Sequence, residues 1–213
     1  AQNALLKTLE EPGERIIIVL VTSRPSDLLP TVVSRCRQLK FIPLPLEKVK
    51  QILIKSGAET GREISMLVNY SWGAPGKAVE LAQNKTFWDL RDKLLENLNA
   101  LPDGNLEDIL EFVKKFHVSR SQVFELESVF EILLSWCRDI QFLQEGMKGE
   151  ELINSDRFNE LNQIIYCFSA EDIVNIQELI YELRNLVFNN NMNLNLALQR
   201  LFIKIKNYGS VKI

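Results

Sequence analysis

Apolar residues recur at intervals of three and four over most of this chain, and that spacing constrains its fold more than any other feature. Residues three and four apart share one face of an α-helix, so such a segment has a single side to bury. From Leu46 onward we find no convincing strand. The sequence therefore predicts a mainly α protein. The clearest example follows Ser169, with Ile173, Ile176, Ile180, Leu183 and Val187.

Two helical parts are predicted from Leu46 onward. Helices at about 46–56, 61–70 and 75–84, separated by glycine and proline, form a small three-helix unit. The chain from about Phe87 onward is predicted to be a larger helical bundle.

The bundle has an expected centre and two expected helix starts. The segment from Gln122 to Glu145 is apolar around most of its circumference, so it should lie in the middle. Ser119 with Gln122, and Ser169 with Asp172, each have the spacing of an N-cap and its return partner.

The first 45 residues have a different pattern. A short helix containing Leu5 and Leu9 is stopped by Pro12 and Gly13, and another short helical segment is expected at 28–34. Residues 16–21 are continuously apolar and mostly β-branched, which is typical of a strand covered on both faces of a parallel sheet. A second strand is expected at 37–42.

Composition narrows the functional classes. The formal net charge is -3 over 213 residues, whereas a protein that grips nucleic acid alone usually has a basic excess. Any DNA contact should therefore be local or shared with other subunits. No apolar stretch is long enough to span a bilayer, so no membrane contact is expected.

The three cysteines, Cys36, Cys137 and Cys167, are far apart and odd in number. They predict neither a disulfide framework nor a metal site, which favours the reducing cytoplasm. The single histidine, His117, cannot form a histidine-based site.

Five segments together resemble the AAA+ clamp-loader family, in particular its bacterial delta-prime type. They resemble, in order, the helix after the Walker B strand, the sensor-1 strand end, the Ser-Arg-Cys motif, the sensor-2 helix and the last collar helix. The order and spacing of the first three fit the family. The segments are 3–12, Thr22-Ser23, 29–36, 72–78 and 193–198.

The resemblance implies three domains. Residues 1–44 correspond to the C-terminal part of an AAA+ core, a remnant of its α/β sheet. Residues 45–85 correspond to a three-helix lid, and residues 86–213 to a helical collar through which such subunits oligomerise. We expect the chain to be the C-terminal part of a longer protein, because it begins without Met inside a predicted helix. Residues 1–42 should then form only a partial layer.

Arg35, within Ser34-Arg35-Cys36, is the first candidate for chemistry. In this family such an arginine acts in trans, as a finger on the ATP bound by the neighbouring subunit. A guanidinium suits that role because its fork can meet phosphate oxygens bidentately. The simpler interpretation is a surface arginine paired with a carboxylate. We interpret Cys36 as a small buried residue.

Thr22 and Ser23 occupy the sensor-1 position, where active relatives orient the attacking water. They could equally end a strand and cap the following turn. At the sensor-2 position, ATP-hydrolysing relatives carry arginine, and this chain has Gly76. Lys77 lies about 100° around the helix and should point elsewhere. Pro75-Gly76 could also be a structural helix start.

The resemblance implies a subunit of the DNA polymerase III holoenzyme that acts by assembly. Its partners would be the motor gamma/tau and delta subunits, with the sliding clamp and primed DNA reached through the complex. No phosphate-binding Gly-x-x-x-x-Gly-Lys-Ser/Thr loop occurs in this sequence, so we expect no intrinsic activity and no cofactor; ATP would be bound by neighbours.

Two other hypotheses remain open at this point. The intact protein could be a gamma/tau-type motor that hydrolyses ATP and tolerates Gly76. A helical adaptor unrelated to replication would explain the bundle but not Ser34-Arg35-Cys36.

Overall fold

The structure is a computed structural model, and it describes residues 2–11, 13, 15–22, 24–57, 64–116 and 122–209. These residues form two compact units, Ala1–Pro43 and Leu44–Ile213. Each is described by itself. The predicted boundary between lid and collar at residue 85 falls inside the second unit and stays a prediction.

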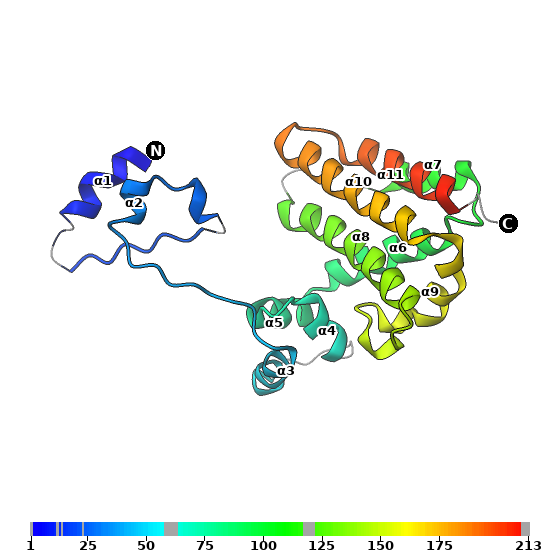
Figure 1. Cartoon of the computed structure of the whole chain (residues 1–213), viewed down its shortest axis with the longest axis horizontal. Coiled ribbons are helices and arrows are strands. Elements are labelled where there is room, and N and C mark those ends of the chain that lie inside the picture. The colour runs from blue at the N-terminus through cyan, green and yellow to red at the C-terminus, as the bar shows by residue number, and fades with distance from the viewer. Residues whose placement is uncertain are drawn as a thin grey trace. The chain divides into compact units, whose positions relative to one another are not determined.

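The first unit contains two helices and a short 3-10 turn (Figure 1). Helix α1 (Gln2–Glu10) packs against α2 (Pro30–Val33), and Val32 is buried at this contact. The 3-10 turn η1 is Pro25–Asp27. The expected helical turns within 28–34 are therefore present, and Pro30 at the first position of α2 starts them.

The two strands predicted in this unit do not form in the described part of the chain. Residues 16–21 and 37–42 are extended but unpaired. The expectation that 16–21 is covered on both faces is wrong here, because Ile17 is 89% exposed; Phe41, in the second segment, is 94% exposed. A strand is stable only when its backbone groups bond to a neighbour. The described residues supply no such neighbour, so the sheet remnant is not seen.

The second unit begins with the three predicted helices, α3 (Leu46–Lys55), α4 (Ile64–Tyr70) and α5 (Pro75–Gln83). Each packs against the other two. We keep the name lid for this three-helix group. Its small core consists of Val49, Leu53, Met66, Leu67, Ala78 and Leu81, all buried.

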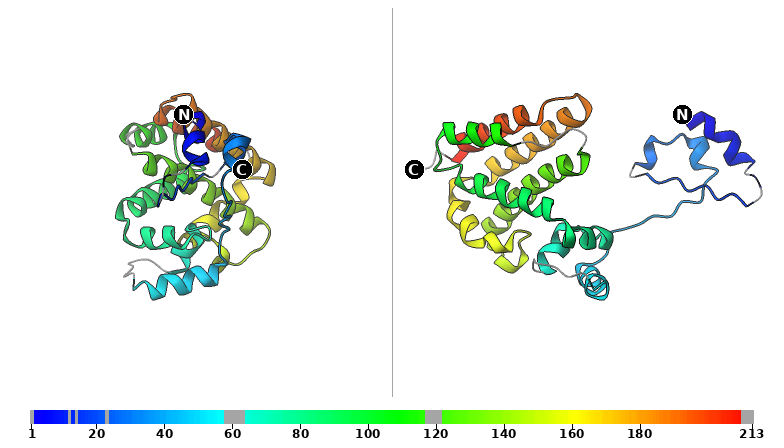
Figure 2. Two further views of the ribbon diagram at one scale, coloured as in Figure 1. Left: turned by 90° about the vertical axis from the view of Figure 1, so that its left-hand side faces the viewer. Right: turned by 180° about the vertical axis from the view of Figure 1, so that it is seen from behind.

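The rest of the unit is a helical bundle, which we call the collar. The long helix α8 lies between α6 and α10, and α11 packs against α10 and α7, as the side and rear views of Figure 2 also show. This confirms the central place predicted for 122–145. The helices are α6 (Lys85–Ala100), α7 (Leu106–Lys115), α8 (Val123–Gln144), α9 (Phe158–Ile164), α10 (Ala170–Asn189) and α11 (Leu194–Gly209), with 3-10 turns at Gly149–Glu151, Ser155–Arg157 and Ile165–Cys167.

Helix α10 follows its sequence pattern closely. The five apolar residues that predicted one buried face, from Ile173 to Val187, are all buried. At its start Ser169 Oγ accepts the backbone N–H of Asp172 at 3.1 Å, and the Asp172 carboxylate accepts the Ser169 N–H at 2.7 Å. The predicted capping box is confirmed. The expected start at Ser119 lies outside the described residues.

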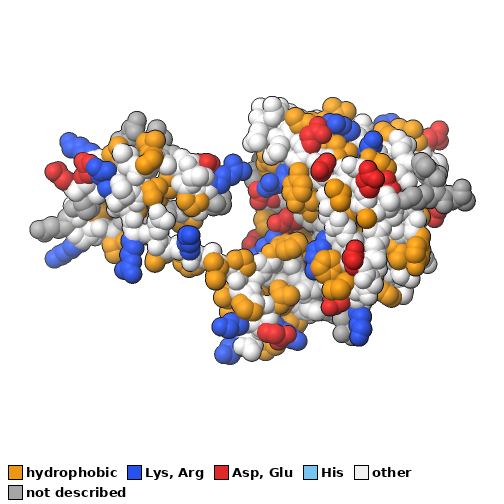
Figure 3. Space-filling view, in the orientation of Figure 1, with side chains coloured by type: hydrophobic (Ala, Val, Ile, Leu, Met, Phe, Trp, Pro, Cys, Tyr) orange, Lys and Arg blue, Asp and Glu red, His pale blue; other side chains and the backbone are white. Residues whose placement is uncertain are grey.

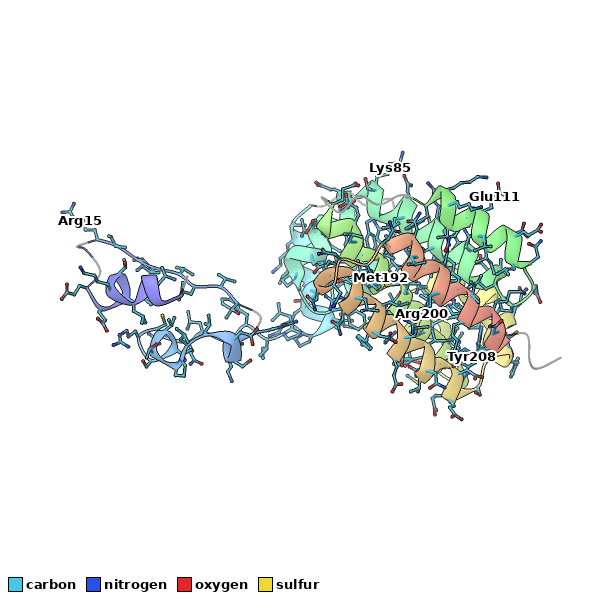
Figure 4. All side chains as sticks on the ribbon, turned by 90° about the horizontal axis from the view of Figure 1, so that it is seen from above. Arg15, Lys85, Glu111, Met192, Arg200 and Tyr208 are labelled. Atoms are coloured by element: carbon cyan, nitrogen blue, oxygen red, sulfur yellow. The ribbon has the colours of Figure 1, made fainter. Side chains whose placement is uncertain are left out.

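On the outside of the collar, Arg200 of α11, which is labelled in Figure 4, pairs with Glu182 of α10 at 2.9 Å. Both side chains are about half exposed, so the pair contributes little to stability. Burial of apolar side chains therefore dominates the packing of α10 on α11. In the part of the chain that the structure covers, no helix is long and apolar enough to cross a membrane.

Two leucines on α11 allow a matched test of this packing. Leu198 is 1% exposed and Leu196 is 55% exposed. Leu198→Ala should lower the free energy of unfolding by about 2–5 kcal/mol, because it removes buried methyl groups and leaves a cavity. Leu196→Ala should change it by less than about 0.5 kcal/mol. Urea unfolding of both variants checks this, and equal effects would contradict the described packing of α11.

Candidate functional site

The Ser-Arg-Cys segment forms the turn that ends α2. Ser34 is the residue after the helix, and Arg35 and Cys36 donate their backbone N–H groups to Val32 and Val33. The Arg35 side chain is 35% exposed. Its Nη1 donates to the Thr31 carbonyl at 2.9 Å, and its Nη2 forms an ion pair with Glu10 of α1.

These two contacts leave part of the guanidinium available. An arginine side chain has five N–H donors in a planar fork, and the two contacts use one donor on each Nη atom. The arrangement includes the simpler interpretation, a surface arginine paired with a carboxylate. It also leaves donors that could meet a phosphate oxygen.

Two of the three cysteines have a raised thiol pKa. Cys137 is fully buried, and burial raises the pKa of its thiol far above the ordinary value. Burial, with a smaller contribution from Asp103, also raises the pKa of Cys167. A raised pKa disfavours the reactive thiolate. Cys36, predicted to be buried, is partly exposed.

At the sensor-1 position Thr22 is exposed, and its Oγ1 accepts the backbone N–H of Arg24 at 3.0 Å. This is the geometry of a turn cap, one of the two interpretations of this residue. Ser23 lies outside the described residues. The hydrogen bonds of Thr22 and of Arg35 are made with different partners.

At the sensor-2 position, Gly76 lies in the first turn of α5, after Pro75 at the first helical position. A Cβ atom added there would meet no atom within 4 Å. Packing therefore does not require glycine at this position. Pro75 alone accounts for a structural helix start, because its fixed φ suits that position.

Lys77, the residue beside Gly76, has a structural partner. Its Nζ donates to both carboxylate oxygens of Glu131 on α8, at 2.7 and 2.8 Å. The expectation that Lys77 points away from the sensor-2 position agrees with this pair. The contact joins the lid helix α5 to the central collar helix.

A buried polar network makes the main junction between lid and collar. Tyr70 of α4 and Arg91 of α6 are both 0% exposed. The Tyr70 hydroxyl donates to Asn154 Oδ1 at 2.6 Å and lies 3.0 Å from Ser135 Oγ of α8. Arg91 Nε donates to the same Asn154 oxygen at 3.0 Å.

The charge of Arg91 is balanced by Asp156 and by Asp92, whose Oδ1 accepts from Nη1 at 2.8 Å. Nη1 and Nη2 donate to the two Asp156 oxygens at 3.1 and 2.5 Å, a bidentate pair. Burial acts to lower the pKa of Arg91, but Tyr70 and Asp156 outweigh it, so that pKa lies above its ordinary value. Burial raises the pKa of Tyr70 to about 12. At neutral pH the network therefore contains a protonated tyrosine and a charged arginine.

Asp139 of α8 binds the same loop through hydrogen bonds. It is 0% exposed, and its carboxylate accepts the backbone N–H groups of Ile153 and Asn154 at 2.8 and 2.7 Å. Burial raises the pKa of Asp139 in spite of these donors. The loop that carries Asn154 and Asp156 is thus tied to α8 as well as to α6.

Sequence reasoning missed this junction and the partner of Arg35. The signal for Arg91 was available: it lies on the apolar side of α6, three or four residues from Phe87 and Leu94, where a lone arginine needs a buried partner. No sequence pattern pointed to Glu10, which is 25 residues from Arg35. Within the described residues, no cluster of His, Cys, Asp and Glu could hold a metal ion.

Comparison with known proteins gives two family matches. Residues 85–207 match the family described as DNA polymerase III, delta subunit, C terminal. Residues 1–45 match the family described as DNA polymerase III, delta subunit. Together they cover the Ser-Arg-Cys segment and nearly all of the collar.

Curated relatives carry related names. A DNA polymerase III subunit delta' of Bacillus subtilis is 27% identical over 82% of this chain and 52% of its own length. That of Escherichia coli is 34% identical over 52% of this chain and 33% of its own length. The Escherichia coli subunit tau is 45% identical, but over only 24% of this chain and 8% of its own length. The chain spans half of the first relative and a third of the second.

These matches and the fold place the chain in the class of DNA polymerase III subunits, with a Ser-Arg-Cys turn, a lid and a helical collar. The resemblance to delta-prime subunits is confirmed. In particular, the chain belongs to the family described as DNA polymerase III, delta subunit, C terminal.

Removal of the Tyr70 hydroxyl group tests the lid–collar network. Tyr70→Phe should lower the free energy of unfolding by about 1–3 kcal/mol, because buried polar partners lose a hydrogen bond. Tyr181→Phe is the matched control, since Tyr181 is 55% exposed on α10, and it should change stability by less than about 0.5 kcal/mol. Chemical denaturation of the two variants measures the difference. If Tyr70→Phe leaves the free energy of unfolding unchanged, the network does not stabilise the junction.

Proposed function

We propose that this chain is part of a clamp-loader subunit of the delta-prime type. The subunit assembles with motor gamma/tau and delta subunits through the collar, and Arg35 acts in trans on ATP bound by a neighbour. One observation carries the proposal: the chain resembles delta-prime subunits over most of its length and has Arg35, partly exposed, in its Ser-Arg-Cys turn.

Arg35 suits phosphoryl transfer because of where charge develops. A water attacks the γ-phosphorus of ATP, the bond to the β–γ bridging oxygen breaks, and negative charge builds on the transferred group and on ADP. An arginine finger stabilises that charge and contributes roughly a thousandfold or more in the analogous GTPases. The Arg35 fork has donors beyond those used by Thr31 and Glu10.

Two features of the lid support the proposal that this subunit does not bind or hydrolyse ATP itself. Gly76 occupies the place of the arginine found in ATP-hydrolysing relatives, although packing leaves room for a side chain there. Lys77 is paired with Glu131. The chain would then need no cofactor of its own, and the ATP would belong to the neighbour. The chain also matches a subunit tau, but over only 24% of its length. We therefore favour the delta-prime type over a gamma/tau-type motor.

The lid and collar would serve as a rigid assembly platform. The network around Tyr70 and Arg91, together with the Lys77–Glu131 pair, joins them within one compact unit. Acidic and basic side chains are interspersed on the face of this unit in Figure 3. Such a surface favours protein partners over unassisted DNA binding.

We infer that the sliding clamp and primed DNA are reached through the assembled cytoplasmic complex. Residues 1–57 contain nine Lys and Arg against five Asp and Glu, whereas the whole chain is net acidic. A local basic excess of this kind could share a DNA contact with sister subunits.

The finger can be tested in the intact subunit reconstituted with its partners. Arg35→Ala should lower the clamp- and DNA-stimulated ATPase rate by about tenfold or more, because one site loses its charge stabilisation. Arg37→Ala removes an exposed arginine two residues away and should leave the rate unchanged. Size-exclusion chromatography confirms assembly of each complex. An unchanged rate for assembled Arg35→Ala would remove the finger from this proposal.

A further inference from the structure

We propose that Glu10 is a positioning residue for Arg35, holding the guanidinium in the orientation in which it meets the neighbour's ATP. This inference rests on the proposed function, because it assigns a role to Glu10 only if Arg35 acts as a finger. It adds a residue from a different helix to that site.

The contact joins two elements that are distant in sequence. Glu10 is the last residue of α1, and Arg35 follows α2, which packs against α1. The Glu10 carboxylate pairs with Arg35 Nη2, while the Thr31 carbonyl accepts from Nη1 at 2.9 Å. The two terminal nitrogens of one guanidinium are therefore each held by a separate group.

These two contacts restrict the orientation of the planar Arg35 guanidinium. An unanchored arginine samples many rotamers, and every rotamer that points elsewhere is unproductive for a finger. Holding one donor on each Nη atom fixes the direction in which the other donors point. Preorganised donors aimed at a developing charge contribute more than donors that must first reorient.

The exposure of the Glu10–Arg35 pair indicates that Glu10 positions the guanidinium and does not shield it from a ligand. The two side chains are 35% and 50% exposed, so water and salt screen their attraction. A single exposed carboxylate holds a guanidinium only weakly. The donors of Arg35 that Thr31 and Glu10 do not use stay available to a triphosphate bound by the neighbour.

The test compares three variants at Glu10 and Glu11 in the intact subunit, reconstituted with its motor partners and stimulated by clamp and primed DNA. Glu10→Ala should lower kcat for ATP about two- to fivefold, the range that an exposed ion pair supplies, with KM unchanged. Glu10→Gln keeps a carbonyl acceptor and should recover most of the loss. Glu11→Ala removes the adjacent exposed carboxylate and should match the unmodified complex.

A double variant separates positioning from a general structural effect. If Glu10 acts through Arg35, Arg35→Ala with Glu10→Ala should have the same rate as Arg35→Ala alone. A further drop in the double variant would assign Glu10 to folding and overturn the inference. An increase in rate for Glu10→Ala would also overturn it, because the carboxylate would then be restraining the finger.

The outcomes for this inference and for the finger are distinct. A large effect of Arg35→Ala with none for Glu10→Ala would remove Glu10 and leave the proposed function intact. No effect of Arg35→Ala in an assembled complex would remove the finger itself.

Discussion

The buried hydrogen-bond network of Tyr70, Arg91 and Asn154 is the interaction on which the arrangement of lid and collar depends. An arginine with no exposed surface must have its charge and its donors satisfied, or folding would leave it desolvated at a large cost. Arg91 donates to Tyr70 of α4, to Asp92 of α6 and to the loop before α9. Asn154 of that loop also donates to Ser135 of α8. The network therefore joins α4 of the lid to two helices and a loop of the collar through hydrogen bonds to buried groups.

The consequence for function is that lid and collar act as one body. The lid has a small apolar core of its own, but Tyr70 and Lys77 are both committed to the collar. Under the proposed function, this attachment limits lid movement, and Gly76 takes the place of the sensor-2 arginine. Both features fit a subunit that supports ATP hydrolysis at a neighbour's site rather than its own.

The first unit is stabilised by different means. Its apolar segments, 16–21 and 37–42, are exposed, and the contacts that organise it are the packing of α1 on α2 and the pair between Glu10 and Arg35. The finger candidate is thus held by a weak, solvent-accessible interaction, while the lid–collar junction is held by a strong and buried one.

Local patterns in the sequence determined the helices, the capping box at Ser169, the buried face of α10 and the family resemblance of Ser34-Arg35-Cys36. These features depend on neighbours within a few residues, so spacing alone reveals them. Only the tertiary structure shows that Glu10 pairs with Arg35 and that Lys77 pairs with Glu131. The same holds for the network of Tyr70, Arg91 and Asp156. The tertiary structure also decided that 16–21 stays unpaired, because a strand, like a buried charge, depends on partners that are remote in the sequence.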